Sequence, residues 1–317
     1  MRDTPDRRTD VRGACLCGAV AFGIAPPYRW FAHCHCSLCR KHHGSLFGTG
    51  LGVARDRFEW LRGADDVVHY SATTAFERPF CRHCGSTLPA VSHDDRFWHV
   101  PAGLLDGDPG ARPRSHIFVA SKSPLYELAD ALPHHAAYPP GLDVPTSERR
   151  TAPTASGTIT GSCLCDGIAF SATAVLRRLV NCYCSLCRRR SGAAFTSTLL
   201  VPTADFRWAH GETRIRHYAM PSPRQYSCDF CPDCGSPTAS VITGQPRVFL
   251  PAGAIDDPWK SPKGDTELPP LSAVHVYVGS KAPWVAITDD GPQFAELPPA
   301  TLGSPRRGAE RFTEFFQ

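Results

Sequence analysis

The chain alternates between short apolar runs and clusters of Gly, Pro and Asp. Runs of about four to eight residues that are rich in β-branched and aromatic residues predict short strands. No window of about fifteen residues shows helical periodicity, and 30 Pro and 26 Gly disfavour long helices. The pattern predicts compact, mainly antiparallel β-domains, with strands in Ala19–Phe22, Leu46–Val53, Val67–Tyr70, Phe97–Val100, Ile117–Val119 and their counterparts, such as Gly167–Phe170.

The same pattern occurs twice, with a period of about 150 residues, which indicates a domain duplication rather than a solenoid. Cys36–Arg40 and Cys184–Arg188 both read CSLCR, and Pro101–Gly103 and Pro251–Gly253 both read PAG. The offset between the two copies increases slightly before the last cysteine pair, which indicates a short insertion in the second copy. A further insertion in the second copy falls around Asp256–Leu268. We therefore expect two tandem copies of one unit.

The boundaries between the copies follow from composition. Residues 139–156 are rich in Pro, Thr, Ser and charge, which is typical of an exposed linker. Residues 298–317 form a Pro-, Gly- and Arg-containing tail. The predicted organisation is therefore a first domain at 10–138, a linker at 139–156, a second domain at 157–297 and a tail at 298–317.

Composition narrows the class of protein. The chain has 317 residues, 42% hydrophobic and 20% charged, which suits two domains with real cores. Its net charge of +4 is not clustered, so we do not expect a nucleic-acid partner. No signal peptide and no membrane-spanning run are visible, and we expect a cytoplasmic protein.

Fifteen cysteines carry the chemistry, and fourteen of them form one series that occurs twice. In a protein of the reducing cytoplasm, closely spaced thiols are typical of metal ligands rather than disulfides. The first series is Cys15-x-Cys17, Cys34-x-Cys36-x-x-Cys39 and Cys81-x-x-Cys84, and the second is Cys163-x-Cys165, Cys182-x-Cys184-x-x-Cys187 and Cys231-x-x-Cys234.

Seven thiols in each half divide naturally into four and three. Four thiolates close a tetrahedral zinc site, whereas three leave one position for an outside molecule. A site that joins the first and last cysteine pairs would close a long loop, where a metal stabilises the fold most. We assign quartet 1 (Cys15, Cys17, Cys81, Cys84) and quartet 2 (Cys163, Cys165, Cys231, Cys234) to structural zinc, and trio 1 (Cys34, Cys36, Cys39) and trio 2 (Cys182, Cys184, Cys187) to catalytic zinc.

Alternatives remain at these sites. A histidine could close trio 1, since His33, His35, His42 and His43 surround it, but their counterparts are Asn181, Tyr183, Arg190 and Ser191. An open site in both halves is therefore favoured. Four thiolates would also suit iron. The remaining thiol, Cys228, aligns with Arg78 and is interpreted as a packing cysteine.

The motifs resemble the glutathione-dependent formaldehyde-activating family, which includes centromere protein V. The match lies in Gly13–Gly18, Cys34–Arg40 and Cys81–Ser86, and in their second-half equivalents. The resemblance implies a mainly β, Mss4-like zinc-binding fold with coiled sheets, and the same division into structural and catalytic zinc. Family members typically hold one such domain, so the tandem form is a departure. Asp166, in place of the usual Gly, is another, and could alter the turn after Cys165.

The resemblance also implies an activity: a carbon–sulfur lyase or synthase that joins glutathione and formaldehyde to S-hydroxymethylglutathione. Zinc would favour the thiolate form of the thiol. The alternatives are a zinc-stabilised binding module and a lyase for another thiol conjugate. The two domains could pack as a pseudo-dimer. Six basic residues could contact the carboxylates of glutathione, although solvated surface charge is the more common role of such residues. They are Arg40, Lys41, Lys122, Arg188, Arg189 and Lys281.

Some other residues are interpreted as structural. His116 and His275 each stand at the start of a predicted strand, where packing or hydrogen bonding is the more common role. Trp60, Trp208, Phe47 and Phe195 are assigned to the cores.

Overall fold

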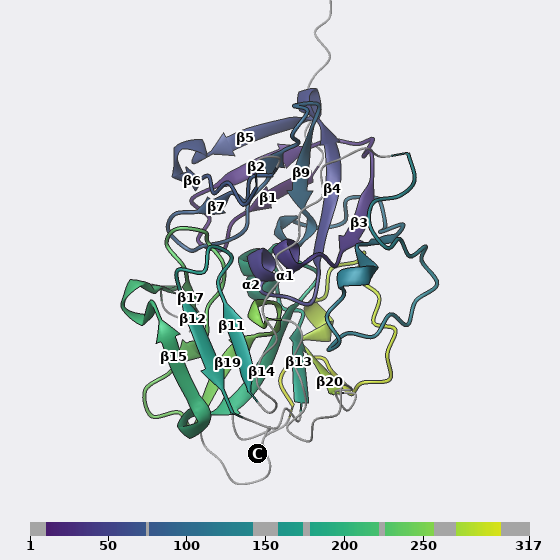
Figure 1. The fold of residues 1–317 in the computed structure, drawn as a ribbon. Helices are drawn as coiled ribbons and strands as arrows, with labels where there is room; N and C mark the ends of the chain where they lie inside the picture. The colour runs from purple at the N-terminus through teal and green to yellow at the C-terminus, as the bar shows by residue number, and fades with distance from the viewer. Residues whose placement is uncertain are drawn as a thin grey trace, which may run out of the picture.

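The computed structural model describes residues 11–73, 76–141, 158–173, 178–221, 226–256 and 271–298. Most of the predicted linker, of the insertion around Asp256–Leu268 and of the tail lies outside the described residues. Figure 1 shows the first half above the second, with both helices near the boundary between them. Among the described residues, no helix has the length and apolar character needed to cross a bilayer.

The first half contains a three-stranded sheet, a five-stranded sheet and a two-stranded ribbon, in the orders β1-β2-β5, β10-β3-β4-β9-β8 and β6-β7. A single short helix, α1, follows β3. The elements are β1 (Val11–Ala14), β2 (Ala21–Ile24), β3 (Phe31–Cys34), α1 (Ser37–His43), β4 (Gly48–Ala54), β5 (Phe58–Arg62), β6 (Val67–Val68), β7 (Phe80–Cys81), β8 (Ala90–Val91), β9 (Phe97–Pro101) and β10 (His116–Ile117).

The second half repeats this plan, with sheets in the orders β11-β12-β15, β18-β19-β14-β13-β20-β21 and β16-β17. The elements are β11 (Ile159–Ser162), β12 (Ala169–Ala172), β13 (Arg178–Cys182), α2 (Ser185–Ser191), β14 (Thr196–Pro202), β15 (Phe206–His210), β16 (Arg216–Ala219), β17 (Ser227–Phe230), β18 (Ser240–Val241), β19 (Arg247–Pro251), β20 (Ser272–Val276) and β21 (Gln293–Phe294).

The mainly β prediction is confirmed, but the antiparallel prediction needs a correction. The larger sheet of each half is mixed, because β10 pairs with β3 in parallel and β20 pairs in parallel with both β13 and β21. Parallel neighbours require a long crossover. Here the chain runs through β4, β9 and a loop before it returns beside β3. Short apolar runs give no signal for such a long-range pairing.

Both helices begin at a cysteine of a trio. The Sγ of Cys36 accepts the N–H of Cys39 at the start of α1, and Cys184 accepts the N–H of Cys187 in the same way in α2. Each helix ends at a glycine in the left-handed conformation, Gly44 with φ 64° and Gly192 with φ 67°. A sulfur cap at one end and a glycine at the other explain why each helix has only seven residues.

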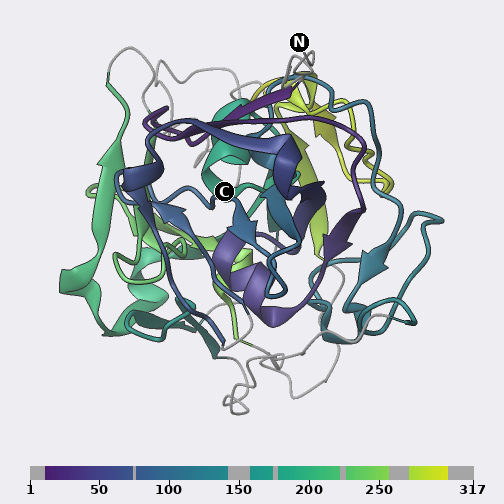
Figure 2. The ribbon, with the colours of Figure 1, turned by 90° about the horizontal axis from the view of Figure 1, so that it is seen from above.

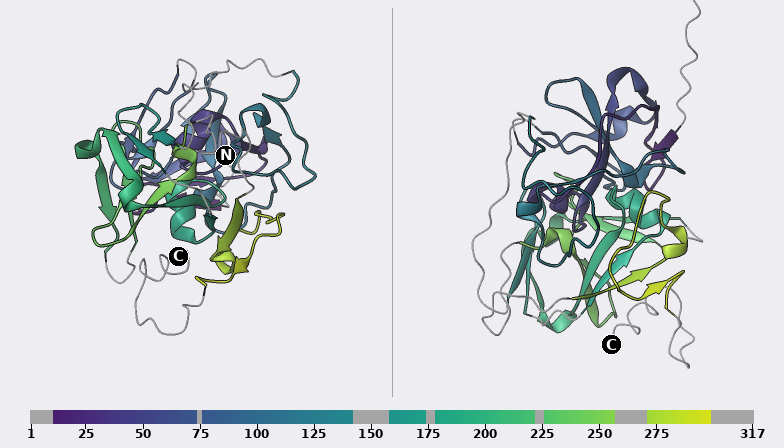
Figure 3. Two further views of the ribbon diagram at one scale, coloured as in Figure 1. Left: turned by 60° about the horizontal axis from the view of Figure 1, so that its bottom comes forward. Right: turned by 90° about the vertical axis from the view of Figure 1, so that its right-hand side faces the viewer.

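The two halves share one hydrophobic core. Phe47 and Phe195 meet edge-to-face with ring centroids 5.3 Å apart. Helix α1 packs on the single turn Ala252–Ala254, and α2 packs on the equivalent turn Ala102–Leu104. The contacts are thus reciprocal, and the views in Figures 2 and 3 show the halves closely apposed.

Backbone hydrogen bonds also cross this boundary. The N–H of Gly103 donates to the carbonyl of Gly192 at 3.0 Å, and the hydroxyl of Ser45 donates to the carbonyl of Phe195 at 2.8 Å. A side chain at Gly103 or Gly253 would overlap backbone of the opposite half. Glycine is therefore required where the PAG turns meet the helices.

Candidate metal centres

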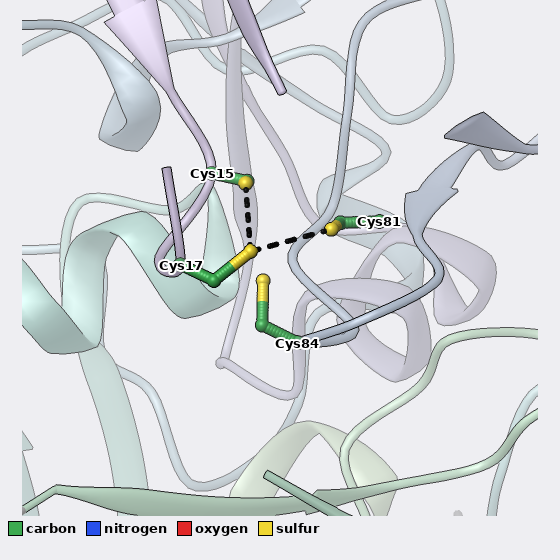
Figure 4. A group of neighbouring side chains, drawn as sticks. All are labelled: Cys15, Cys17, Cys81 and Cys84. Carbon is green, nitrogen blue, oxygen red and sulfur yellow. Dashed lines mark hydrogen bonds between the residues drawn. The ribbon is translucent and has the colours of Figure 1, made fainter. Parts of the chain in front are cut away.

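The sulfurs of each predicted quartet lie together. In quartet 1 all four Sγ atoms lie within 4.8 Å of one another, and Figure 4 shows them converging on one point. The Sγ of Cys17 lies 3.4 Å from that of Cys15 and 3.7 Å from that of Cys81. Zinc–sulfur bonds of about 2.3 Å in a tetrahedron place sulfurs about 3.8 Å apart, so this donor set fits zinc or another thiophilic ion. Quartet 2 has the same geometry.

Tight turns bring the quartet sulfurs together. After Cys17 the chain turns at Gly18 with φ 76°, and after Cys84 it turns at Gly85 with φ 65°. The hydroxyl of Ser86 accepts the N–H of Leu16 at 3.0 Å, and so links the two cysteine pairs. These turns bend the CxC segment, whose side chains would point to opposite faces in a flat strand.

Asp166 keeps the corresponding turn in the second half. Its φ of 65° matches the left-handed conformation of Gly18, and its N–H donates to the carbonyl of Cys163 at 3.2 Å. Asp is one of the few residues besides Gly that adopt this conformation with little strain. The departure from the family pattern therefore leaves the turn unchanged.

Each trio lies at the junction of a strand and a helix. Cys34 is the last residue of β3, Cys36 caps α1, and Cys39 lies in its first turn. Their Sγ atoms lie within 4.8 Å of one another, as do those of Cys182, Cys184 and Cys187. Within the described part of the chain, neither trio has a fourth Cys, His, Asp or Glu donor within this distance of all three sulfurs.

The histidines around trio 1 are engaged elsewhere. His33 Nδ1 hydrogen-bonds Thr49 Oγ1 at 2.9 Å, His35 Nε2 bonds His116 Nδ1 at 2.8 Å, and His43 Nδ1 donates to the carbonyl of Ser191 at 2.6 Å. His42 is buried, and neither of its ring nitrogens has a hydrogen-bond partner. None of the four belongs to the donor group of trio 1, which argues against closure by histidine.

In each trio, the residue between the first two cysteines, His35 or Tyr183, is held by a buried histidine that in turn bonds an aspartate. His116 Nε2 bonds Asp130 Oδ2 at 2.9 Å and its Nδ1 bonds His35. In the second half His275 bonds Asp289 at 2.8 Å and Tyr183 at 2.9 Å. Both histidines are 1% exposed, and each bonds through both ring nitrogens, which confirms the expected packing and hydrogen-bonding role.

The two aspartates were missed by sequence reasoning. A signal was present, because both Asp130 and Asp289 stand three residues before a proline in the duplicated pattern. In the first half, His134 also approaches Asp130, with Nε2 4.0 Å from Oδ1. His116, Asp130 and His134 thus form a further group of possible metal donors. However, His116 Nε2 and Asp130 Oδ2 hydrogen-bond each other directly, so these two atoms already have partners.

The two trios face different polar groups. In the first half, Arg78 Nη2 lies 4.0 Å from Cys39 Sγ. Burial alone would lower the pKa of Arg78, but the sulfurs of trio 1 raise it above its usual value. In the second half, the hydroxyl of Tyr226 donates to Cys187 Sγ at 3.8 Å. Burial, with the nearby sulfurs, raises the pKa of Tyr226 well above its usual value.

Several of the cations considered for glutathione have structural roles instead. Lys41 is buried and pairs with Asp256 of the other half. Arg189 pairs with Asp106 across the same boundary, and Lys122 Nζ donates to backbone carbonyls of its own loop. The surface-charge expectation was wrong for Lys41 and for Arg40, which is 3% exposed. It fits Lys281, which is exposed.

The predicted core aromatics are found in the core. Phe47 and Phe195 are buried, and Trp60 and Trp208 are partly buried against the core. Cys228 is also buried, but its thiol points across the boundary and donates to the carbonyl of Cys84 at 3.6 Å.

Each half helps to enclose a cysteine quartet of the other. One apolar cluster joins Cys36 and Leu38 of the first half to Cys163, Cys231 and Cys234 of quartet 2. Conversely, Cys228 reaches the backbone of quartet 1. The guanidinium of Arg190 lies between the quartets and donates to the carbonyls of Gly85 at 2.6 Å and Gly235 at 3.4 Å.

Comparison with known proteins agrees with this geometry. The family profile "Glutathione-dependent formaldehyde-activating enzyme" matches residues 10–121 and 158–279. The chain belongs to the glutathione-dependent formaldehyde-activating enzyme family. The two matched segments make it a tandem member, with one quartet and one trio in each.

Individual relatives match one unit at a time. A Halomonas elongata protein with the provisional name glutathione-dependent formaldehyde-activating enzyme is 32% identical over 130 residues, which is 37% of this chain and 80% of the relative. An uncharacterized lyase of Schizosaccharomyces pombe is 24% identical over 122 residues, 38% of this chain and 87% of the relative. A Rhodobacter sphaeroides crystal structure is 24% identical with a TM-score of 0.26, and covers 31% of this chain and 89% of its own.

Proposed function

We propose that the chain is a zinc-dependent carbon–sulfur lyase that interconverts S-hydroxymethylglutathione with glutathione and formaldehyde. The single observation that carries this proposal is the pair of three-sulfur sites, which have no fourth described protein donor. Three protein ligands and one exchangeable position are the pattern of catalytic zinc. Membership of the family supports the glutathione and formaldehyde chemistry.

The residues present fit the metal that this function needs. Both quartets and both trios consist of thiols only, a soft donor set that suits zinc. We infer structural zinc at the quartets and catalytic zinc at the trios, which makes about four ions per chain. Zinc in a trio would supply a Lewis-acidic position that favours a thiolate over a thiol.

The reaction itself is an addition. The glutathione sulfur forms a bond to the formaldehyde carbon, the carbonyl π-bond breaks, and the proton of the thiol ends on the new hydroxyl oxygen. Cleavage is the reverse and needs no oxidant or reductant. The chain's contribution is to hold the sulfurs in place: β3 and β13 fix the first, and the N–H groups of Cys39 and Cys187 fix the sulfurs of Cys36 and Cys184.

The packing of the two halves and the number of thiols bear on the assembly and the compartment. The reciprocal contacts between the halves support a pseudo-dimer, in which each half covers a quartet of the other. Because fourteen thiols must stay reduced to bind metal, we expect the protein to work in the cytoplasm.

The test is the rate of adduct formation, followed by proton NMR of zinc-loaded protein with glutathione and ¹³C-formaldehyde. We expect a rate above the uncatalysed reaction, and its loss in the double variant Cys36→Ser/Cys184→Ser. Cys228→Ser, which removes a thiol outside every quartet and trio, is the matched control. If the double variant kept the full rate, the proposal would be wrong.

The same assay separates a glutathione enzyme from a lyase for another conjugate. Cysteine and 2-mercaptoethanol replace glutathione at equal thiolate concentration. Preference for glutathione supports the substrate proposed here, and equal or better use of another thiol moves the assignment to that conjugate. No acceleration with any thiol would favour a zinc-stabilised binding module.

A further inference from the structure

We propose that the two trios are specialised: trio 1 takes an anionic fourth ligand, the thiolate of the substrate, whereas trio 2 takes a neutral one. This inference rests on the function proposed above and deepens it, because it assigns thiol capture to the first half. The argument depends on one position at which the duplicated halves differ.

In the first half this position holds a cation. Arg78 Nη2 lies 4.0 Å from Cys39 Sγ, and its guanidinium carbon lies 5.5 Å from the ring centroid of Phe76. Its Nη1 donates to the carbonyl of Glu77 at 3.0 Å, and its backbone N–H donates to Tyr70 at 2.7 Å. These contacts hold the positive charge against trio 1 and limit its freedom to move to solvent.

In the second half the cation is missing from the equivalent position. Cys228 aligns with Arg78, and its thiol points away from trio 2 to the carbonyl of Cys84. Tyr226, which aligns with Phe76, directs its hydroxyl to Cys187 Sγ at 3.8 Å. A neutral phenol therefore contacts trio 2, where a guanidinium contacts trio 1.

The other nearby arginines do not explain the difference. Arg40 and Arg188 occupy equivalent positions on α1 and α2, so each half has one. The Arg188 side chain donates to the carbonyls of Tyr183 at 3.3 Å and Ser280 at 3.5 Å. Cys184 and Cys187 act to raise the pKa of Arg188, but burial lowers it overall, whereas Arg78 lies in direct contact with a sulfur of trio 1.

A charge count shows why the fourth ligands should differ. Three thiolates on a divalent ion carry a net charge of −1, and a fourth thiolate makes it −2. The guanidinium of Arg78 would return the loaded trio 1 to −1. Among the described residues, no guanidinium contacts a sulfur of trio 2 in this way, and a neutral ligand leaves that site at the same −1. Charge-assisted contacts of this kind are among the stronger hydrogen bonds in proteins.

The experiment measures ligand binding rather than turnover. The full chain is loaded with Co²⁺, and glutathione is added while the visible d–d bands report conversion of a three-sulfur site to a four-sulfur site. We expect one tight equivalent per chain, with the second at least about tenfold weaker, which is the scale of one hydrogen bond to a charged group. Arg78→Met should weaken the tight equivalent by about the same factor.

Further variants separate charge from damage to the site. Arg78→Lys should restore most of the tight binding, and Tyr226→Phe should leave the tight equivalent unchanged. Arg96→Met removes an exposed arginine, 67% accessible, and controls for net charge. Imidazole, a neutral ligand, should bind trio 1 of Arg78→Met as well as it binds wild type, with metal content unchanged.

The outcomes are distinct. Two equivalents of equal affinity, or an Arg78→Met protein with unchanged affinity, would overturn the specialisation while leaving the proposed lyase intact. Binding of glutathione at neither trio would overturn both. Loss of imidazole binding together with thiol binding in Arg78→Met would show that Arg78 only supports the shape of the site, and would also overturn the inference.

Discussion

Lys41 and Asp256 form an ion pair across the boundary between the halves, with Nζ 2.6 Å from Oδ1. The equivalent pair with the halves exchanged is Arg189 with Asp106. The side chains of the first pair are 4% and 12% exposed, and those of the second are 30% and 48% exposed. The duplication has thus produced one buried and one solvated version of the same contact.

This difference predicts unequal costs of removal. Lys41→Met leaves the carboxylate of Asp256 without its buried partner and removes bonds to Ser162 and Ala254. Breaking a buried pair on one side typically costs about 3 kcal/mol or more. Arg189→Met should cost less than about 1 kcal/mol, because solvent screens an exposed pair. Urea unfolding of the two variants measures both values.

The double variant Lys41→Met/Asp256→Asn is the control for the buried pair. Since it leaves no uncompensated charge, it should recover part of the stability lost in Lys41→Met. Equal destabilisation by Lys41→Met and Arg189→Met would contradict the difference in burial described here.

The grouping of the thiols was predictable because CxC and CxxC spacings constrain which sulfurs can share an ion. Most strands of the apolar runs were also predictable, although β2 begins at Ala21 rather than Ala19 and β6 ends at Val68 rather than Tyr70. The predicted strand Ile117–Val119 was largely wrong, because β10 ends at Ile117 and a single 3-10 turn begins at Val119. Helices α1 and α2 were missed, because two turns are too short to show a period of 3.6. Their sulfur caps are not among the usual N-cap residues.

Contacts between remote segments were not predictable from one sequence. Lys41 looks like an ordinary surface lysine until the opposite half places Asp256 beside it. Arg78 is likewise a single arginine in a polar stretch, and only the fold brings it to Cys39. A sequence pattern defines the faces of one domain, but not which faces of two domains meet.

Arg190 predicts a coupling between the two quartets. Its guanidinium donates to carbonyls next to both Cys84 and Cys234, and the side chain is 3% exposed. In Arg190→Met these carbonyls lose a charged donor, which typically costs about 1.5–3 kcal/mol. We expect a chelating dye to remove zinc several-fold faster from two sites per chain.

A matched control is available for this prediction. Arg207 also donates to backbone carbonyls, those of Ala204 and Phe206, but it is exposed. Arg207→Met should release zinc at the wild-type rate. Faster release from a single site in Arg190→Met would show that the arginine supports one quartet and does not couple the two.

The quartets and trios should differ in their effect on folding. Quartet 1 joins the start of the first half to Cys81 and Cys84, so a metal bound there would close a long loop. Trio 1 lies within one strand–helix junction and closes almost none. Cys84→Ser should therefore lower the thermal midpoint far more than Cys36→Ser, as measured by circular dichroism with zinc analysis. Similar midpoints for the two variants would argue against a structural role for quartet 1.

Burial of His43 predicts a loss of stability in acid. Burial lowers the pKa of His43 from 6.5 to about 4, against the opposing effect of its bond to the carbonyl of Ser191. Between these values the unfolded chain binds more protons than the folded one, so stability is complete above about pH 6.5 and is lost as pH falls toward 4. Each pH unit in this window costs up to about 1.4 kcal/mol from this one residue.

His43→Gln removes this titration, because glutamine can donate to Ser191 but does not ionise. The variant should be less stable than wild type at pH 7, yet its free energy of unfolding should fall less steeply between pH 6.5 and 5. Protonation of the quartet and trio thiols affects both proteins alike, so the difference in slope isolates His43. Identical slopes for His43→Gln and wild type would mean that His43 is not held neutral by the fold.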